Sequence, residues 1–300
     1  MAKKIELLGL ESIPNVNPGD SLVDYIIQAL HRENVKLDTG DILVISSKVV
    51  SKAEGRIVDL EDIKPGKAAK AIAKLTGKDS RRVQVIKEES SKIVGYLSLE
   101  KLSKNRDFIK SYFGEDDVEK ILALNEAVLF SVMPGGQIMT DAGTDFSNVE
   151  GKNMMSLLPK DPMQSAGNLR KEIEKKQENS IGVVISDTEI RALRQGTTDI
   201  ALGYDGVVPM MKEFGEEDLF GSPTFGGIDA IADQMASSAS LLMGQCAEKI
   251  PVVILKGLDR FFDPENLMKE ETALPFHLMA SFMKDVIISR FKLSLYTRFG

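Results

Sequence analysis

Residues that build soft metal sites and disulfides are scarce in this sequence. Its 300 residues include one cysteine, Cys246, and two histidines, His31 and His277, which lie far apart in the chain. One cysteine forms no intramolecular disulfide, and these three residues are too few and too scattered for a Cys/His zinc cluster. Any metal ion is therefore expected to be a hard cation on oxygen ligands, such as Mg²⁺ or Mn²⁺.

Long apolar runs and excess positive charge are also missing. No stretch reaches the roughly 18 uninterrupted apolar residues of a membrane span. The first residues, MAKKIELLGLESIP, lack the apolar core and cleavage site of a secretory signal. The formal net charge is -7, which argues against a general binder of nucleic-acid phosphates. The sequence predicts a cytoplasmic protein whose partners are neither membranes nor nucleic acids.

The familiar nucleotide-binding motifs are absent as well. The chain has no G-x-x-x-x-G-K-[ST] pattern, and no G-x-G-x-x-G follows a predicted strand. A nucleotide bound by this protein would therefore contact neither of the two common phosphate-binding loops.

The sequence does contain a mixed succession of helix and strand patterns. Apolar residues make up 43% of the chain, which is enough for a sizeable core. Helices are predicted at 20–33, 66–77, 79–90, 116–126, 166–179, 227–244 and 276–291, and strands at 40–50, 127–133, 181–186 and 251–257. A Pro-Gly-Gly turn at 134–136 predicts a hairpin. This mixed order indicates an α/β or α+β fold.

Two of the predicted helices carry an apolar stripe. A helical spacing in 227–244 predicts one buried face made of Ile228, Ile231, Met235, Ala239 and Leu242. The segment 276–291 is amphipathic in the same way. That second stripe would pack on its own subunit, widen a dimer interface or cover a substrate pocket.

Three segments run from an apolar strand directly into polar side chains, at 44–56, 139–148 and 183–203. Strand ends are places where rigid scaffolds display reacting groups. Asp145 and Asp187, with the Thr188 hydroxyl, would form a hard-cation site that phosphate oxygens and water complete. Turn formation around Asp145 and helix capping by Asp187 are the structural alternatives. The cations that would balance phosphate charge are Lys48, Lys52, Arg191 and Arg194.

Five motifs in fixed order carry a family resemblance over roughly residues 11–257. They are VVSKAEGR, DAGTDFSNVEG, GVVISDT followed by two arginines and QGTTDIALG, EDLFG, and SLLMG followed by KIPVVILKG. Together they resemble the coenzyme F420-0:L-glutamate ligase family. The resemblance implies an α+β fold with mixed sheets and flanking helices, and an intertwined homodimer. It also implies a GTP-dependent ligase that uses Mg²⁺ or Mn²⁺ to join L-glutamate to a deazaflavin acceptor.

The same resemblance implies roles for individual residues. Asp145, Asp187 and Thr188 match the family's metal positions, and Arg191 and Arg194 match arginines that would offset charge on the transferred group. The nucleotide positions are matched by Ser47, Lys48, Lys52 and Asn148, by the backbone of Ile13, Pro14, Asn15 and Val16, and by the loop that begins with Met243, Gly244 and Gln245.

Departures from the family pattern leave the acceptor open. Both arginines after Thr188 are kept, but the family's Phe-Gly and Pro-Trp are replaced by Glu189-Ile190 and Ala192-Leu193. Asp141 replaces an asparagine, and Gln234 replaces a glutamate. The alternatives are therefore a ligase for a folate- or pterin-type acceptor, or a nucleotide-binding relative without catalysis. Location alone makes Asp141 and Glu54 candidates for the base. The expected organisation is a catalytic region at 1–257 and a C-terminal extension at 258–300.

Overall fold

The computed structural model describes residues 3–97, 110, 127–190, 196–266, 281 and 284. Backbone contacts divide the chain into two units. The first comprises Met1–Asp59 and Gly143–Thr272, and the second comprises Leu60–Ala142 and Ala273–Gly300. No helix among the described residues is long and apolar enough to span a membrane.

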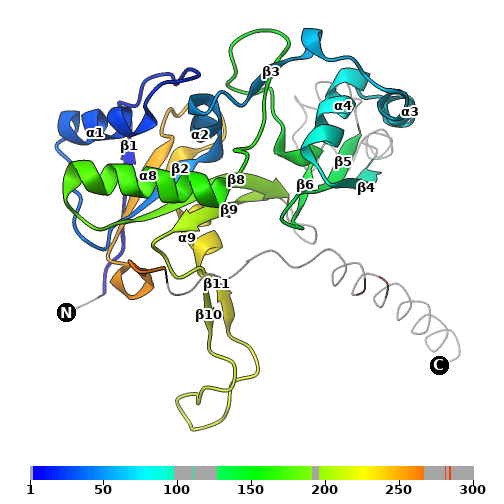
Figure 1. Ribbon diagram of the computed structural model, residues 1–300. Helices are drawn as coiled ribbons and strands as arrows, with labels where there is room; N and C mark the ends of the chain where they lie inside the picture. Colours follow the sequence, from blue (N-terminus) through cyan, green and yellow to red (C-terminus); the bar gives the residue numbers. More distant parts are fainter. Residues whose placement is uncertain are drawn as a thin grey trace, which may run out of the picture. The chain divides into compact units, whose positions relative to one another are not determined.

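A five-stranded sheet forms the centre of the first unit (Figure 1). In spatial order it consists of β1 (Glu6–Leu10), β12 (Val252–Lys256), β2 (Ile42–Ser46), β8 (Gly182–Ile190) and β9 (Thr197–Asp205). β2 and β8 run parallel, and the other neighbours are antiparallel. The two parallel strands therefore end at the same edge of the sheet.

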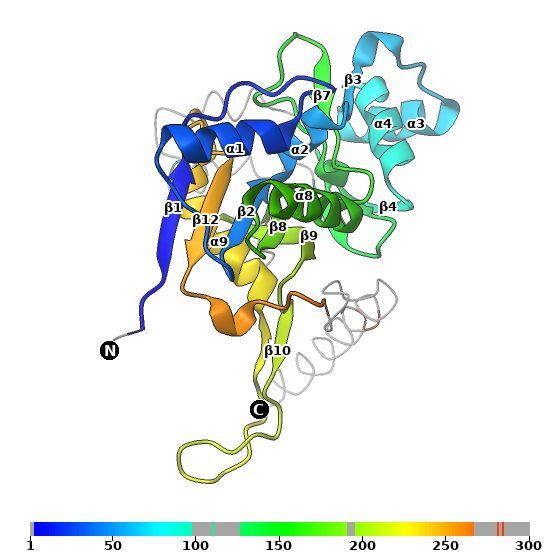
Figure 2. The same ribbon diagram turned by 60° about the vertical axis from the view of Figure 1, so that its left-hand side comes forward.

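Helices cover both faces of this sheet (Figure 2). They are α1 (Leu22–Arg32) and α8 (Pro162–Gln177) on one face and α9 (Ile231–Met243) on the other. Successive side chains of β8 point to opposite faces of the sheet, which explains why both faces are covered. Val183 and Ile185 belong to the apolar cluster under α1 and α8, whereas Val184 belongs to the cluster under α9. The helix predicted at 20–33 is confirmed, with Ser21 as the N-cap that accepts from the Asp24 amide.

Two short ladders complete the first unit. β3 (Ile57–Asp59) pairs with β7 (Met154–Ser156), and β10 (Met210–Lys212) pairs with β11 (Ile228–Ala230). The hairpin made by β10, β11 and their connecting loop extends away from the sheet as a long ribbon (Figures 1 and 2).

The second unit combines helices with a small antiparallel sheet. Its elements are α3 (Lys67–Thr76), α4 (Ser80–Glu89), β4 (Lys92–Leu97), β5 (Val128–Val132) and β6 (Ile138–Thr140), with sheet order β4-β5-β6. Ala69 and Ile86 from the helices pack with Leu129 from the sheet. The predicted turn at 134–136 connects β5 to β6, so the hairpin prediction is confirmed. The mixed α+β class is likewise confirmed.

Two element predictions are wrong in their extent. The strand predicted at 40–50 ends at Ser46, and α2 (Ser47–Ala53) follows directly, because Val49, Val50 and Ala53 pack on the first apolar cluster at helical spacing. The helix predicted at 227–244 begins only at Ile231. Ile228 pairs within β11 instead and is 63% exposed, so it is not part of the buried helix stripe.

Two further helix predictions fall wholly or mostly on residues that the structure does not describe. The helix predicted at 116–126 lies outside them, and only 281 and 284 of the helix at 276–291 are described. The start of the expected extension, 258–266, packs on the first unit. Leu258 and Phe261 are buried, and the Arg170 guanidinium donates to the Pro264 carbonyl at 2.8 Å.

Candidate functional site

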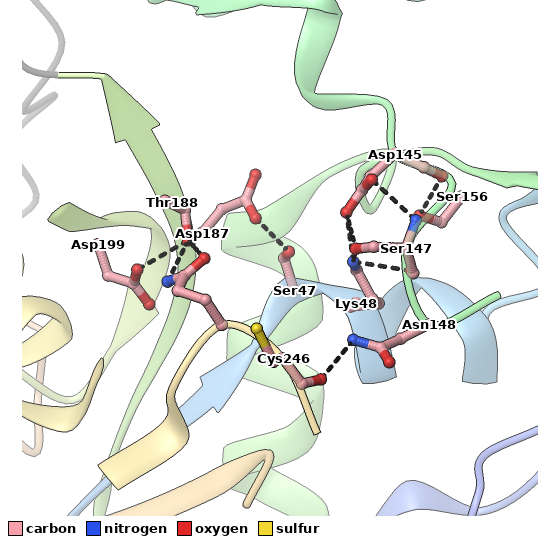
Figure 3. Close-up of polar contacts among 11 residues, drawn as sticks. Ser47, Lys48, Asp145, Ser147, Asn148, Ser156, Asp187, Thr188, Asp199 and Cys246 are labelled. Atoms are coloured by element: carbon pink, nitrogen blue, oxygen red, sulfur yellow. Dashed lines mark hydrogen bonds and ion pairs between the residues drawn. The ribbon is translucent and has the colours of Figure 1, made fainter. Parts of the chain in front are cut away.

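The parallel strands β2 and β8 bring the first two predicted site residues together. Ser46 lies opposite Ser186 in the ladder, so Ser47 and Asp187 follow at the same edge. The Ser47 hydroxyl donates to Asp187 Oδ1 at 3.1 Å (Figure 3). Ser47 is itself buried, so α2 presents this hydroxyl from a fixed position.

Lys48, the next residue of α2, holds the second predicted carboxylate. Its ammonium donates to Asp145 Oδ2 at 2.5 Å, to Ser147 Oγ at 2.6 Å and to the Ser147 carbonyl at 3.0 Å. Asp145 and Ser156 also exchange two backbone hydrogen bonds, of 3.1 and 2.8 Å, which fix the loop that carries the carboxylate. The sequence placed Asp145 and Lys48 in one site, and the structure joins them through an ion pair.

The pKa values of the two aspartates are shifted in opposite directions. Burial raises the pKa of Asp187 to about 7, against smaller lowering effects from the Ser47 hydroxyl, the Thr188 backbone and the charge of Lys48. Burial also raises the pKa of Asp145, but hydrogen bonds from Lys48 and Ser147 outweigh it and hold that pKa below its ordinary value. Asp187 is thus a carboxylate that a further positive charge would return to its ionised form.

Thr188 belongs to a second group of polar residues, because successive side chains of a strand point to opposite faces. The Thr188 hydroxyl donates to Asp199 Oδ1 at 2.9 Å, and Gln245 Nε2 donates to the Thr188 oxygen at 3.0 Å (Figure 3). Burial raises the pKa of Asp199, and hydrogen bonds from Thr188 and Gln245 partly oppose the shift. Asp199 was not assigned to the site from the sequence, and its position opposite Thr188 in the β8–β9 ladder places it there.

The loop after α9 contacts both groups of polar residues: the one that contains Asp145 and the one that contains Thr188. Met243 is the last residue of the helix, and Gly244 follows with φ 63° and ψ -168°, a conformation open essentially to glycine. Gln245 then contacts Thr188, and the carbonyl of Cys246 accepts a hydrogen bond from Asn148 Nδ2 at 3.1 Å. The predicted positions Met243, Gly244, Gln245 and Asn148 are therefore brought together, with Asn148 fastening the loop.

Lys52 lies one helical turn after Lys48 on α2. Burial lowers its pKa, the neighbouring charge of Lys48 lowers it further, and Glu150 raises it. Within the described part of the chain Lys52 makes no hydrogen bond or ion pair. Two ammonium groups in this position favour an anion beside them, since an anion would relieve their repulsion.

The segment from Ile13 to Val16 precedes α1. Ile13 and Val16 are buried in the core, whereas Pro14 and Asn15 are exposed. Shortly after it, the Gly19 amide donates to the Ala53 carbonyl at the end of α2 at 3.0 Å. Among the described residues no hydrogen bond joins Ile13–Val16 to the aspartates.

The four remaining candidates lie elsewhere or outside the described residues. Arg191 and Arg194 fall in 191–195, which the structure does not describe. Glu54 accepts a hydrogen bond from Ser165 at the start of α8 at 2.5 Å. Asp141 lies in the second unit and accepts from Lys78 Nζ at 2.7 Å. Glu54 and Asp141 thus have structural partners, and neither is retained as a base.

The donor set suits a hard cation that a substrate helps to bind. Asp145 and Asp187 supply carboxylate oxygens, and both feel the positive charge of Lys48. No group of three or more His, Cys, Asp or Glu side chains among the described residues is arranged to hold an ion alone. Mg²⁺ is commonly bound by one or two carboxylates together with phosphate oxygens and water, so the residues fit a metal that arrives with a phosphate ligand.

Comparison with known proteins assigns the chain to a family. Residues 11–257 match the model of the F420-0:gamma-glutamyl ligase family. A coenzyme F420:L-glutamate ligase of Methanothermobacter thermautotrophicus is 36% identical over 253 residues, covering 84% of this chain and 89% of the relative. Proteins of the same name from Methanocaldococcus jannaschii and Archaeoglobus fulgidus are 35% and 34% identical, over 85% of this chain and 88% and 89% of their own lengths. The chain belongs to the F420-0:gamma-glutamyl ligase family, a family of ligase enzymes.

Proposed function

We propose that this protein is a GTP- and divalent-metal-dependent ligase that forms an amide bond between coenzyme F420-0 and the amine of L-glutamate. One observation carries the proposal beyond family membership. Two carboxylates from separate elements, Asp145 and Asp187, both interact electrostatically with the Lys48 ammonium, and Lys52 lies one helical turn away on α2. This combination of acidic oxygens and ammonium groups suits a nucleotide phosphate with its metal ion.

The proposed reaction has two steps, since joining a carboxylate to an amine in water is unfavourable. An oxygen of the acceptor carboxylate attacks the terminal phosphorus of GTP, the bond to the bridging oxygen breaks, GDP leaves, and an acyl phosphate is formed. The amine of glutamate then attacks the acyl carbon, and phosphate leaves. A bound Mg²⁺ or Mn²⁺ supplies charge neutralisation at the phosphates. Asp145 and Asp187 would hold the metal, and Lys52 would bind phosphate oxygens. The Thr188 hydroxyl donates to Asp199 instead, so Thr188 is not placed with Asp145 and Asp187 on the metal.

The mechanism depends on positioning more than on covalent chemistry by the protein. Ser47 and Lys48 orient the two carboxylates before substrates arrive, because each is fixed by α2 at the end of β2. Asn148 and Gln245 hold the loop after α9 against the same strand ends. Arg191 and Arg194 would offset the charge of the transferred phosphoryl group.

Product analysis of an acceptor panel tests the proposal. The purified protein is incubated with GTP, Mg²⁺ or Mn²⁺, L-glutamate and one acceptor (deazaflavin, folate or pterin acid), and products are measured by mass spectrometry. We expect a glutamate adduct of the deazaflavin, with GDP and phosphate released only when both co-substrates are present. A folate adduct would favour the second acceptor class. Thermal stabilisation by GTP without turnover on any acceptor would instead indicate a binding protein.

We further propose that the protein acts as a homodimer and that the β10–β11 hairpin contributes to the dimer contact. The loop of this hairpin exposes Leu219 by 98%, Phe220 by 92% and Phe225 by 83%. Large apolar side chains grouped in one exposed loop are typical of a surface that a partner covers.

A further inference from the structure

The Lys48 ammonium makes three hydrogen bonds, and all three end on one short loop (Figure 3). It donates to Asp145 Oδ2 at 2.5 Å, to Ser147 Oγ at 2.6 Å and to the Ser147 carbonyl at 3.0 Å. An ammonium group has three protons and no lone pair. Lys48 therefore keeps no donor for a phosphate while it holds this loop.

The Asp145 carboxylate is almost saturated by the same contacts. Its Oδ2 accepts from Lys48 and from the Ser147 hydroxyl, and its Oδ1 accepts from the Ser147 amide at 2.9 Å. A carboxylate offers about four lone-pair positions, so about one position remains for a metal ion. A dication there would also be repelled by the ammonium that shares the carboxylate. Lys48 thus lowers the affinity of Asp145 for a metal ion that arrives alone.

Lys52 differs from Lys48, although it lies one turn later on the same helix, α2. Lys52 makes no hydrogen bond or ion pair within the described part of the chain, so its donors are available to an anion. A phosphate that enters the site therefore meets one ammonium that is available and one, Lys48, that is engaged with a carboxylate.

We propose that Lys48 competes with the divalent metal for Asp145 and moves to a phosphate oxygen when a nucleotide brings the metal. The inference rests on the proposed function, in which Asp145 binds the metal and a nucleotide supplies the phosphate. Each partner is replaced by another of the same sign: Asp145 exchanges the ammonium for the metal, and Lys48 exchanges the carboxylate for the phosphate. The site thereby selects the metal–nucleotide complex over the free metal ion.

The loop should keep its shape without Lys48, so a variant at this position can be interpreted. Asp145 and Ser156 exchange two backbone hydrogen bonds, and the Ser147 amide and hydroxyl donate to Asp145 independently of Lys48. Lys48→Met keeps an unbranched side chain of good helix propensity and removes the charge. Lys52→Met makes the same change one turn later on α2 and is the matched control.

Calorimetry with Mn²⁺ alone and with the Mn²⁺–GTP complex tests the exchange. Lys48→Met should bind Mn²⁺ alone about tenfold more tightly than the parent. Its affinity for the Mn²⁺–GTP complex should rise less than about threefold, because there the parent's ammonium has a phosphate partner. Lys52→Met should bind Mn²⁺ alone within about threefold of the parent, since its ammonium contacts neither carboxylate. In an Asp145→Asn background, Lys48→Met should leave Mn²⁺ binding unchanged.

A second variant keeps the test decisive if Lys48→Met fails to fold. Lys48→Gln removes the charge but keeps N–H donors for the loop, and it should show the same gain for Mn²⁺ alone. No gain in the folded variants would overturn the competition. An equal gain for Mn²⁺ alone and for the Mn²⁺–GTP complex, or an equal gain in Lys52→Met, would overturn the exchange. The expected gains in a protein that joins glutamate to no acceptor would overturn the proposed function and leave the exchange standing.

Discussion

Among single residues, Asp187 provides the most direct test of the proposed metal site. Asp187→Asn keeps the size and the hydrogen bond from Ser47 but removes the charge that a hard cation needs. Ligase activity should fall by about two orders of magnitude or more. The measurement is steady-state kinetics across a titration of Mg²⁺ and Mn²⁺. Unchanged turnover with unchanged metal affinity would remove Asp187 from the ligand set.

The same residue makes a prediction about pH. The pKa of Asp187 is raised from 3.8 to about 7, so the folded state binds the proton more tightly than the unfolded state. The contribution of Asp187 to the stability of the metal-free protein should therefore fall as pH rises from about 4 to 7. Asp187→Asn has no charge to bury, and at pH 8 in EDTA it should be more stable than the parent by on the order of 1–2 kcal/mol. The gain should shrink at pH 5, and thermal melts at both pH values measure it. An equal gain at both would show that the carboxylate is not the cause.

Asp141 gives a third residue-scale prediction, concerned with folding rather than catalysis. The Lys78 side chain is 2% exposed, and its ammonium pairs with Asp141 at 2.7 Å. The Leu129 amide donates to the other carboxylate oxygen at 2.9 Å. Asp141→Asn removes the carboxylate charge that pairs with this buried ammonium, which should cost about 3–5 kcal/mol of unfolding free energy.

Urea unfolding measures this cost, and a double variant supplies its control. Adding Lys78→Met to Asp141→Asn removes the buried ammonium as well, so most of the loss should be regained. A loss below about 1 kcal/mol in the single variant, or no recovery in the double variant, would mean that the pair is not the source.

At the scale of elements, the sequence predicts local structure better than pairing. The helix at 20–33 could be predicted because its apolar spacing depends on neighbouring residues. The placement of β12 between β1 and β2 could not be, since it joins strands from opposite ends of the chain. Asp145, Asp187 and Lys48 could be predicted as one site from their motifs.

Asp199 shows why the rest of the site could not be predicted. The ladder of β8 and β9 shifts by one residue between Ile185 and Ser186, and only this bulge sets Thr188 opposite Asp199. A regular ladder continued from Val183 and Asp205 would place Ile200 there instead. Bulges are tertiary features that residue periodicity does not reveal.

The last residues of the segment 258–266 are predicted to stabilise the first unit. Its end is tied to the first unit, because Asn266 Oδ1 accepts from the Gly206 amide at 2.6 Å and Pro264 accepts from Arg170. Truncation after Asp263 removes both contacts, whereas truncation after Asn266 keeps them. The shorter protein should be less stable than the longer one by about 1–3 kcal/mol, as measured by thermal or urea unfolding. Equal stability would show that residues 264–266 contribute nothing to the stability of the first unit.

At the scale of the whole molecule, the family match covers 11–257 and so includes the strands and loops that carry the proposed site. We propose that the acceptor is decided by the residues after Thr188, where this chain departs from the family pattern. Glu189 and Ile190 continue β8 opposite Thr198 and Thr197, and Ile190 is 47% exposed. They lengthen the strand past Thr188, so a change in acceptor preference is compatible with unchanged binding of nucleotide and metal.

Assembly of two chains is the remaining question at this scale, and the β10–β11 hairpin makes it testable. Leu219 and Phe220 are almost fully exposed, so replacing both with serine removes apolar surface without opening a core. If a second chain covers this loop, Leu219→Ser/Phe220→Ser should lower the dimer's stability by several kcal/mol, since burying one such side chain contributes about 1.5–3 kcal/mol. Multi-angle light scattering over a dilution series should then show monomer where the parent is dimeric, with an unchanged circular dichroism spectrum. Leu75→Ser, at a 69% exposed apolar position on α3, is the control and should leave the parent's state intact. A double variant that stays dimeric at every concentration would mean that other surfaces hold the two chains together.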